Sequence, residues 1–355
     1  MHVKPIGPGP PGLKVDCDRV VGARESGAGT EGLTLLGIDI GGTKRVLAVG
    51  DHTSAIRARV RSPMRFSGDW RRDLDDLIAE ARGLLREAGG AEAGSLEAIG
   101  VAAPGPVDLR SGVLRNPPNL PGWRDVPIAQ VLGEAFGVPV RVENDANAAA
   151  LAEHRFGAGR GARHLIYLTM STGVGGGVIS DDRLVRGANG FAGELGHVPI
   201  VRGGLRCACG LRGCLEAYVG GNAWAKRLRR RAPDTSRVVE GAGGDRSKIG
   251  PELLIAAART GDAFACAELA RWLDCLAAGL VPLVMAFDPE RIVLGTIAVA
   301  AGEALCFAPL RERVAALVWP HQAERLEIVP AALGDALPEQ AALAVAGAGA
   351  TRPGG

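Results

Sequence analysis

Hydrophobic residues along this chain fall into short apolar runs and helical repeats that alternate, a pattern typical of an α/β protein. The branched apolar run at residues 33–40 predicts a buried strand, and residues 45–50 and 55–60 predict two strands that return along it. Further strands are expected at residues 98–102, 139–142, 164–170, 174–180, 291–294 and 326–329. Helical spacing predicts helices over residues 74–85, 128–136, 144–156, 216–231, 251–260, 262–286 and 301–318.

These elements form two clusters, and each cluster opens with a strand, a glycine-bearing turn and a second strand. The pattern predicts two related α/β lobes around a cleft, which suits a chain of 355 residues that is long for a single core. We assign residues 33–142 to an N-terminal lobe and residues 143–345 to a larger C-terminal lobe. Residues 1–32 are rich in Gly and Pro and predict a disordered extension, and residues 346–355 predict a flexible tail.

Charge and composition indicate which classes of binding partner this protein is not built for. The 41 basic and 39 acidic residues are interspersed and give a net charge of +2, which argues against a dedicated nucleic-acid or membrane surface. The longest apolar stretch, residues 276–287, is shorter than the roughly 20 residues needed to cross a bilayer. Residues 1–12 lack the apolar segment of a secretory signal, so we expect a cytoplasmic protein.

Two glycine-rich turns carry candidate phosphate chemistry. Asp39 ends a strand and is followed by Gly41, Gly42, Thr43 and Lys44, so a carboxylate for Mg²⁺ and donors for phosphate stand together. A tight hairpin is an equally good reading of this turn alone. Residues 169–177 repeat the arrangement, with hydroxyl side chains followed by four glycines in five positions. Two such turns in one chain favour phosphate binding over two plain hairpins.

Residues 143–147 place Asn144, Asp145 and Asn147 at the start of a predicted helix. Asn and Asp are favoured helix caps, and spacing alone favours that structural role. The functional alternative is that Asp145 is a general base that takes the proton of a substrate hydroxyl during phosphoryl transfer.

Three of the seven cysteines cluster at Cys207, Cys209 and Cys214, shortly after His197. Three thiolates and one imidazole complete a closed tetrahedral zinc site, which predicts a structural rather than a hydrolytic metal. The alternative, three unrelated buried thiols, fits the compact spacing poorly. Zinc would order a loop flanked by Glu194 and Glu216.

Together these segments resemble the ROK family (repressors, open reading frames and kinases) from about residue 35 to about residue 333. The resemblance rests on both glycine turns, on residues 143–147 and 193–197, and on the cysteine cluster that ends at Glu216. Residues 103–108 and 116–123 are similar to the sugar-side loops of the family.

The resemblance implies a two-lobed, actin-like ATPase fold of the hexokinase and ribonuclease H-like type, with the active site in the cleft between the lobes. It implies an ATP-dependent sugar kinase that uses Mg²⁺ and phosphorylates a 6-hydroxyl, with Asp145 as the base. The implied sugar-binding residues are Gly105, Asn144, Glu194, His197 and Glu216. The implied ATP- and Mg²⁺-binding residues are Asp39, Gly41, Gly42, Thr43, Lys44, Thr172, Gly173, Gly175 and Gly295. A homodimer or higher homo-oligomer is also implied.

Several alternatives stay open within this resemblance. Glucose is the first choice of substrate, and amino sugars such as N-acetylglucosamine, N-acetylmannosamine and kanosamine are the next. A transcriptional repressor or a non-catalytic sugar-binding relative is a further alternative, although residues 1–32 are too short and too rich in Gly and Pro for a helix-turn-helix. Thr296 stands where the family has a second glycine, and threonine adopts positive φ at a cost, so a reshaped adenosine loop is expected.

Overall fold

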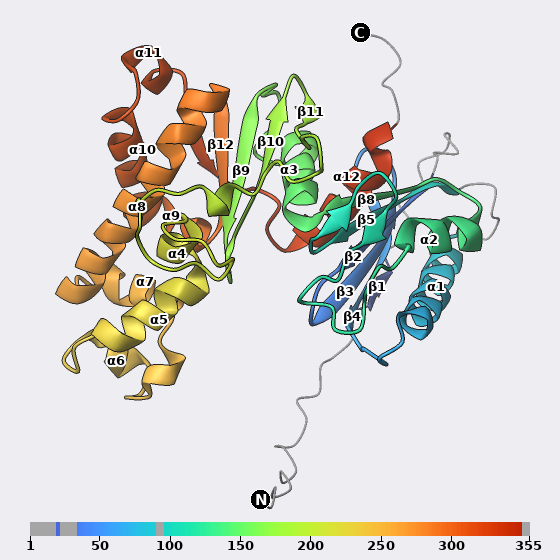
Figure 1. The fold of residues 1–355 in the computed structure, drawn as a ribbon, viewed down its shortest axis with the longest axis horizontal. Coiled ribbons are helices and arrows are strands. Elements are labelled where there is room, and N and C mark those ends of the chain that lie inside the picture. The colour runs from blue at the N-terminus through green and yellow to red at the C-terminus, as the bar shows by residue number, and fades with distance from the viewer. Residues whose placement is uncertain (1–18, 22–33, 90–95, 350–355) are drawn as a thin grey trace, which may run out of the picture.

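A computed structural model of the protein describes residues 19–21, 34–89 and 96–349, and these form two α/β lobes, each built on one mixed sheet (Figure 1). The expected extension over residues 1–32 lies outside the described residues, apart from the short strand β1 (Arg19–Val21). Residues 350–355 also lie outside them. The two-lobed α/β fold class is confirmed.

The first sheet has the strand order β1-β4-β3-β2-β5-β8. Strands β2 (Thr34–Ile40), β3 (Lys44–Gly50) and β4 (Ile56–Pro63) form an antiparallel meander, and β5 (Leu96–Ala103) and β8 (Val140–Asn144) continue the sheet parallel to β2. Alternate residues of β2 face opposite sides, as the pleat requires. Leu36 and Ile38 share a core with α1 (Trp70–Glu87) and α2 (Ile128–Phe136), whereas Leu35 faces the other side.

The second sheet repeats this topology with the order β11-β10-β9-β12-β13. Its meander is β9 (Leu165–Met170), β10 (Val174–Ser180) and β11 (Arg183–Leu184), and its parallel strands are β12 (Arg291–Thr296) and β13 (Glu327–Pro330). Helix α3 (Asp145–Phe156) covers one face, and the core of the other face includes α5 (Gly221–Arg231), α7 (Pro251–Arg259), α8 (Ala263–Phe287) and α10 (Ala308–Ala315). The repeat agrees with the two related lobes expected from the sequence.

Two of the predicted helices are broken by glycines. The segment 216–231 forms α4 (Glu216–Val219) and α5, because Gly220 is extended and the Gly221 N–H instead donates to the Ser171 carbonyl at 2.8 Å. The segment 301–318 begins in α9 (Ile297–Gly302), continues through a π-helical turn (Glu303–Phe307) and ends in α10, with Gly302 at φ 79°. Short helices α6 (Arg237–Gly241) and α11 (Pro320–Ala323) complete this lobe.

Helix α8 is, among the described residues, the one helix long and apolar enough to cross a bilayer by length and composition. Half of its apolar window is buried inside the second lobe, where Trp272 and Leu276 are fully buried. We therefore interpret α8 as a core helix.

The last α-helix of the described chain contacts both lobes. Helix α12 (Leu337–Ala346) follows the second lobe in the chain but packs on β2 and β5 of the first sheet, and it also contacts α3 (Figure 1). Gly37 and Gly100 permit this contact, because a Cβ on Gly100 would collide with the backbone of α12 at Ala342 and Ala346. Ala346, expected in the tail, is buried, and its carbonyl accepts Arg141 Nη1 at 2.7 Å. Helix α12 was not predicted from the sequence.

Candidate active site

The two glycine turns lie at corresponding places in the two sheets, each between the first two strands of a meander. In the first turn the Gly41 N–H donates to the Lys44 carbonyl at 2.9 Å, and a Cβ on Gly42 would lie 2.9 Å from the Asn119 carbonyl oxygen. Thr43 and Lys44 are exposed at this turn. The loop at residues 117–123 therefore packs on a turn that only glycine fits, and the donors of the turn stay open to solvent.

Backbone hydrogen bonds and close packing fix the conformation of the second glycine turn. The Ser171 N–H donates to the Gly173 carbonyl at 3.0 Å, and the Asn222 N–H donates to the Thr172 carbonyl at 3.0 Å. A Cβ on Gly173 would collide with the Glu216 carboxylate, and one on Gly175 would lie 2.9 Å from the Ala146 Cβ. The turn is thus fixed against the start of α5 and the start of α3 together.

Asp39 and Asp145 lie at the carboxyl edge of the first sheet. The parallel register places Asp39 beside Ala102 and Ala102 beside Glu143, which is two residues before Asp145. Burial, together with the charges of Asp145 and Glu339, raises the pKa of Asp39 to about 7 even though Lys44 lowers it. Two carboxylates that repel each other beside a lysine form a site suited to a cation and a phosphate.

The start of α3 accommodates both roles expected for residues 143–147. Asn144 is the cap, since its Oδ1 accepts the N–H groups of Ala146 at 3.0 Å and Asn147 at 3.3 Å. Asp145 follows as the first helical residue. Solvent reaches its side chain, but surrounding protein atoms displace much of the water around the carboxylate. This desolvation raises the pKa of Asp145, and the charge of Glu194 raises it further, while the Ala146 N–H lowers it.

A small cavity of about 20 Å³ adjoins this helix start, and it brings three of the expected sugar residues together. Its lining includes Gly105, Asn144, Asn147, Phe191 and Glu194. A Cβ on Gly105 would lie 3.6 Å from Asn144 Nδ2, so the amide of the cap residue faces the glycine.

Glu216 lies outside this cavity. Its Oε2 accepts the Val174 N–H at 2.9 Å, and its Oε1 lies 3.5 Å from Cys207 Sγ, so the carboxylate joins the second glycine turn to the cysteine cluster.

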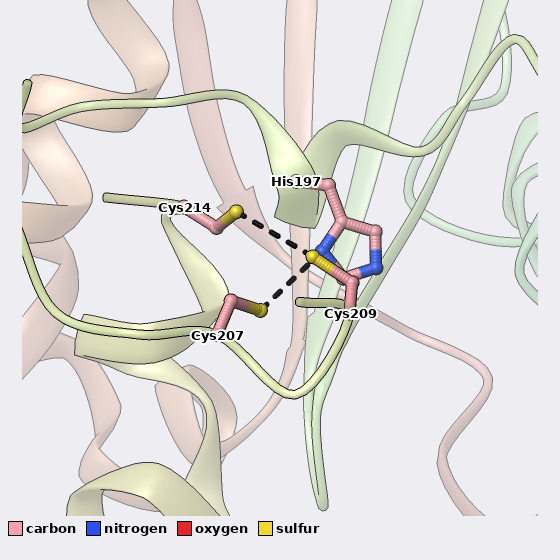
Figure 2. A group of neighbouring side chains, drawn as sticks. All are labelled: His197, Cys207, Cys209 and Cys214. Carbon is pink, nitrogen blue, oxygen red and sulfur yellow. Dashed lines mark hydrogen bonds between the residues drawn. The ribbon is translucent and has the colours of Figure 1, made fainter. Parts of the chain in front are cut away.

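His197, Cys207, Cys209 and Cys214 come together, with their ligand atoms all within 4.8 Å of one another. Figure 2 shows the three sulfur atoms and the imidazole turned toward a common point. Cys207 Sγ lies 3.7 Å from His197 Nδ1, and Cys209 Sγ lies 3.8 Å from Cys214 Sγ. Ligand atoms about 2.3 Å from one ion lie about 3.8 Å apart along the edges of a tetrahedron, so the spacing fits zinc. His197 Nε2 faces the other way, 3.9 Å from Glu194 Oε2.

A larger pocket of about 450 Å³ opens beside the second glycine turn, and Thr172 is the expected nucleotide residue that lines it. Residues 221–222, 248–252 and Thr296 line it as well. Gly295 is buried in β12, where it pairs with Thr169. Thr296 adopts φ 47° and ψ −103°, and its hydroxyl bonds to the Met170 carbonyl and lies 3.2 Å from Thr169 Oγ1. Hydrogen bonds therefore hold this threonine at a positive φ, a conformation that is costly for a residue other than glycine.

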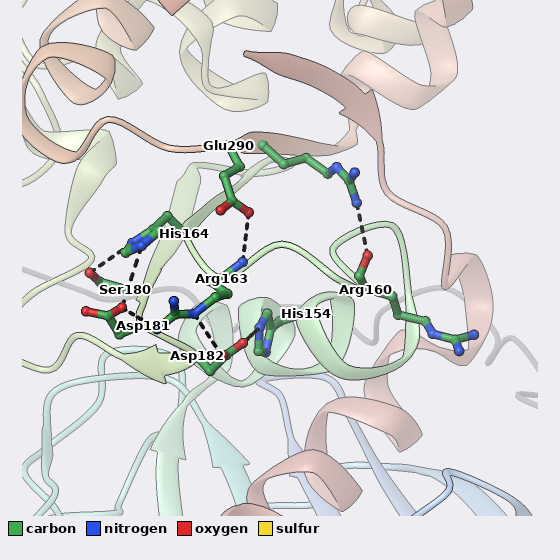
Figure 3. A network of polar contacts seen from close by, with 9 residues as sticks. His154, Arg160, Arg163, His164, Ser180, Asp181, Asp182 and Glu290 are labelled. Atoms are coloured by element: carbon green, nitrogen blue, oxygen red, sulfur yellow. Dashed lines mark hydrogen bonds and ion pairs between the residues drawn. The ribbon is translucent and has the colours of Figure 1, made fainter. Parts of the chain in front are cut away.

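Another polar cluster lies at the far end of the second sheet, near the start of β9 (Figure 3). Asp181 and Asp182 form the turn between β10 and β11, where Asp182 contacts His154 Nε2 at 3.1 Å and Asp181 accepts Arg163 Nη2 at 2.7 Å. The Arg163 N–H donates to Glu290 at 2.8 Å. The cluster ties the last turn of α3 to the hairpin, away from the glycine turns, so we assign it to the scaffold.

Three residues near the cavity, Glu143, Arg186 and Phe191, were not predicted from the sequence, and Asn147 was named there only at the helix start. Glu143 is 1% exposed and accepts Arg186 Nε at 2.7 Å, although the two residues are 43 positions apart. Asn147 and Phe191 line the cavity. A buried carboxylate or amide leaves no pattern that a single sequence reveals; the nearest signal was Glu143 at the end of an apolar strand.

Comparison with known proteins finds sugar kinases and also xylose repressors, one of them from Bacillus spizizenii with 32% identity over 240 residues. A glucokinase from Thermotoga maritima is 37% identical over 303 residues, which cover 85% of this chain and 93% of the relative. The structure resembles a ROK hexokinase from Thermus thermophilus, with a TM-score of 0.74, 37% identity and coverage of 88% of this chain and 97% of that one. It also resembles a ROK family glucokinase from Streptomyces griseus in complex with glucose and AMPPNP, with a TM-score of 0.71, 32% identity and coverage of 89% and 100%. The ROK family model matches residues 35–348, and the chain belongs to the ROK family.

Proposed function

We propose that the protein is an ATP-dependent glucokinase, which transfers the terminal phosphoryl group of ATP to the 6-hydroxyl of glucose. A relative covering most of the chain is a glucokinase, and a solved structure with the same fold holds glucose and AMPPNP. The observation that carries the proposal is the position of Asp145, between the cavity lined by Glu194 and the two glycine turns.

The chemistry follows from the placement of the side chains. Glucose bound beside the start of α3 would contact Gly105, Asn144 and Glu194, and Asp145 would accept the proton of the 6-hydroxyl as that oxygen attacks phosphorus. Asp39 would hold Mg²⁺, which neutralises charge that develops on the phosphates. The donors of the first turn and of Thr172 would bind the phosphate oxygens, and the pocket of about 450 Å³ suits the adenosine.

We also propose a structural zinc bound by His197, Cys207, Cys209 and Cys214. With Nδ1 on the metal, His197 Nε2 is left facing Glu194 and the cleft. Zinc would thereby fix the ring orientation of His197. A metal-bound histidine commonly uses its second ring nitrogen to hydrogen-bond another group. Reduced thiols and ATP both suit a cytoplasmic location.

The test is turnover of a hexose panel by the wild type and by Asp145→Asn, measured as ADP release and sugar phosphate formed. Because loss of a general base costs about 10² to 10⁴-fold, the variant should lose kcat by that factor while binding glucose with similar affinity. Near wild-type turnover in Asp145→Asn would remove Asp145 from the role of base. Preference of the wild type for an amino sugar over glucose would keep the mechanism and correct the substrate.

A further inference from the structure

The segment that carries Phe191 and Glu194 forms a closed loop between the two lobes. The Ala192 N–H donates to the Arg186 carbonyl at 3.1 Å, so residues 187–191 protrude from a fixed base. The loop follows β11 of the second sheet, yet it contacts the first lobe. Arg110 Nη2 donates to the Ala188 carbonyl at 3.4 Å, and a Cβ on Gly190 would lie 3.0 Å from the Leu109 side chain. We call residues 186–194 the substrate loop.

A single buried carboxylate holds both this loop and the start of the catalytic helix. Glu143 Oε2 accepts Arg186 Nε at 2.7 Å, and Glu143 Oε1 accepts the Asn144 N–H at 3.1 Å and Asn147 Nδ2 at 3.0 Å. The side chain of Glu143 is 2% exposed and that of Arg186 is 44% exposed. The ion pair therefore joins the end of β8 in the first sheet to the base of a loop from the second sheet.

Asn147 provides an independent sign that a ligand or water completes this region. It is 2% exposed, and within the described part of the chain its Oδ1 is buried without a hydrogen-bond partner. Glu143 fixes the amide by accepting from Nδ2, which directs Oδ1 toward Gly193, where a Cβ would lie 2.9 Å away. A buried acceptor without a partner is costly and rare, and this one belongs to the lining of the sugar cavity.

We propose that Glu143 and Arg186 are positioning residues that set the distance between the base Asp145 and the sugar-binding residue Glu194. This proposal rests on the proposed function. Asp145 lies two residues after Glu143, and Glu194 lies at the end of the loop that Arg186 anchors. Loss of the pair lets the substrate loop move relative to α3, which weakens sugar binding and leaves the nucleotide pocket on the far side of the second glycine turn unchanged.

The variants are Glu143→Gln, Arg186→Ala and the double variant, with Arg186→Lys as the conservative change. Gln keeps an acceptor for Asn144 and Asn147 but places an amide donor against Arg186, so it breaks the pair selectively. Arg186→Ala breaks the same pair from the exposed side. The matched control is Glu268→Gln. Glu268 lies on α8 outside the cavity, is also 1% exposed, and forms ion pairs with Arg231 of α5 at 3.4 Å and with Arg271.

The measurements are KM for the best hexose, KM for ATP, kcat and Tm. We expect KM for the hexose to rise about 10-fold in Glu143→Gln and in Arg186→Ala, with KM for ATP changed less than 2-fold. The double variant should be no worse than the worse single variant, because both changes remove one interaction. In Arg186→Lys, the KM for the hexose should lie between the wild-type value and that of Arg186→Ala. Glu268→Gln should lower Tm and leave both KM values unchanged.

An unchanged hexose KM in Arg186→Ala would overturn the proposal, as would an equal rise in both KM values or additive effects in the double variant. These outcomes leave the kinase function intact. Absence of hexose phosphorylation by the wild type would refute the proposed function and this inference together.

Discussion

Asp39 illustrates at the scale of one residue how a functional site costs stability. Its carboxylate is half-buried, and its neighbours include Asp145 and Glu339, which are both acidic. With a pKa of about 7, Asp39 of the folded protein keeps its proton between about pH 4 and pH 7. In the unfolded chain the same carboxyl group is already ionised over this range. Ionised Asp39 therefore destabilises the fold above pH 7, and this cost fades as the pH falls from 7 toward 4.

We predict that Asp39→Asn raises the free energy of unfolding by roughly 1 to 3 kcal/mol at pH 8 and has little effect near pH 4. The measurement is urea unfolding of the protein at both pH values without nucleotide or Mg²⁺. Asp76→Asn is the control, because Asp76 is exposed on α1 and should give no gain at either pH. A gain of the same size at both pH values would show that the charge of Asp39 is not its source. Kinase activity should fall in Asp39→Asn.

At the scale of an element, the loop from His197 to Cys214 combines its own backbone hydrogen bonds, such as that of the Ile200 N–H to the Gly213 carbonyl at 2.8 Å, with the four candidate zinc ligands. Its exposed side chains include Val201, Leu205 and Leu211, and its buried cysteines, Cys207 and Cys214, form a small cluster with Ala217 and Tyr218. We predict about one zinc per chain by elemental analysis. Cys209→Ser should lose the metal and raise KM for the sugar, since His197 loses its fixed orientation.

Cys266→Ser is a matched control for this change, because Cys266 is exposed like Cys209 but lies on α8. It should retain zinc and full activity. A metal-free preparation with wild-type KM and Tm would contradict the zinc assignment.

The packing of α12 on the first sheet depends on glycine at position 100. A Cβ there would meet backbone atoms of α12, and backbone cannot move aside as a flexible side chain can. We predict that Gly100→Ala lowers the free energy of unfolding by about 3 kcal/mol. Gly83→Ala makes the same change inside α1, where the nearest atom is Arg86 Nη2 at 4.0 Å, and it should stabilise by about 1 kcal/mol. If the urea midpoint shifted in the same direction from wild type in both variants, this account would be refuted.

Elements with a local signal could be predicted from the sequence, and α12 could not. The two meanders were found because β-branched residues and glycine turns lie within a short segment, and the zinc ligands were found because three cysteines lie within eight positions. Helix α12 is buried without interruption from residue 341 to residue 346, so its sequence has no polar face there and no helical period of hydrophobicity. Glu143 and Arg186 were missed because a contact between lobes leaves no local pattern.

At the scale of the whole molecule, the chain crosses between the lobes twice. The first crossing is the step from β8 into α3, where Asn144 and Asp145 lie. The second is the segment from β13 to α12, which Glu153 holds: this fully buried carboxylate of α3 accepts the N–H groups of Ala332 and Leu333 at 3.0 Å each. Closure of the lobes around substrates would therefore bend the chain at the residues that carry the chemistry.

The second crossing also predicts how the molecule can be divided. Without α12, the face of the first sheet that contains Leu35, Ala48 and Ala98 loses its apolar cover, Leu343 and Ala346. It also loses the pairing of buried Glu339 with Arg61, where Nε and Nη2 lie 2.7 and 2.9 Å from the carboxylate. A fragment of residues 34–144 should therefore fail to fold alone, and co-expression with residues 331–349 should restore a cooperative thermal transition measured by circular dichroism.

The same co-expression with Glu339→Ala in the second fragment is the decisive control. It removes the carboxylate but keeps Leu343 and Ala346, so it separates the ion pair from the apolar contact. Because Glu339→Ala removes the ion pairs that this carboxylate forms with Arg59 and Arg61, we expect the transition to fall by several degrees while remaining cooperative. A sharp transition in residues 34–144 alone would mean that the first lobe is complete without α12. In that case the chain order, rather than the packing of α12, would define the lobes.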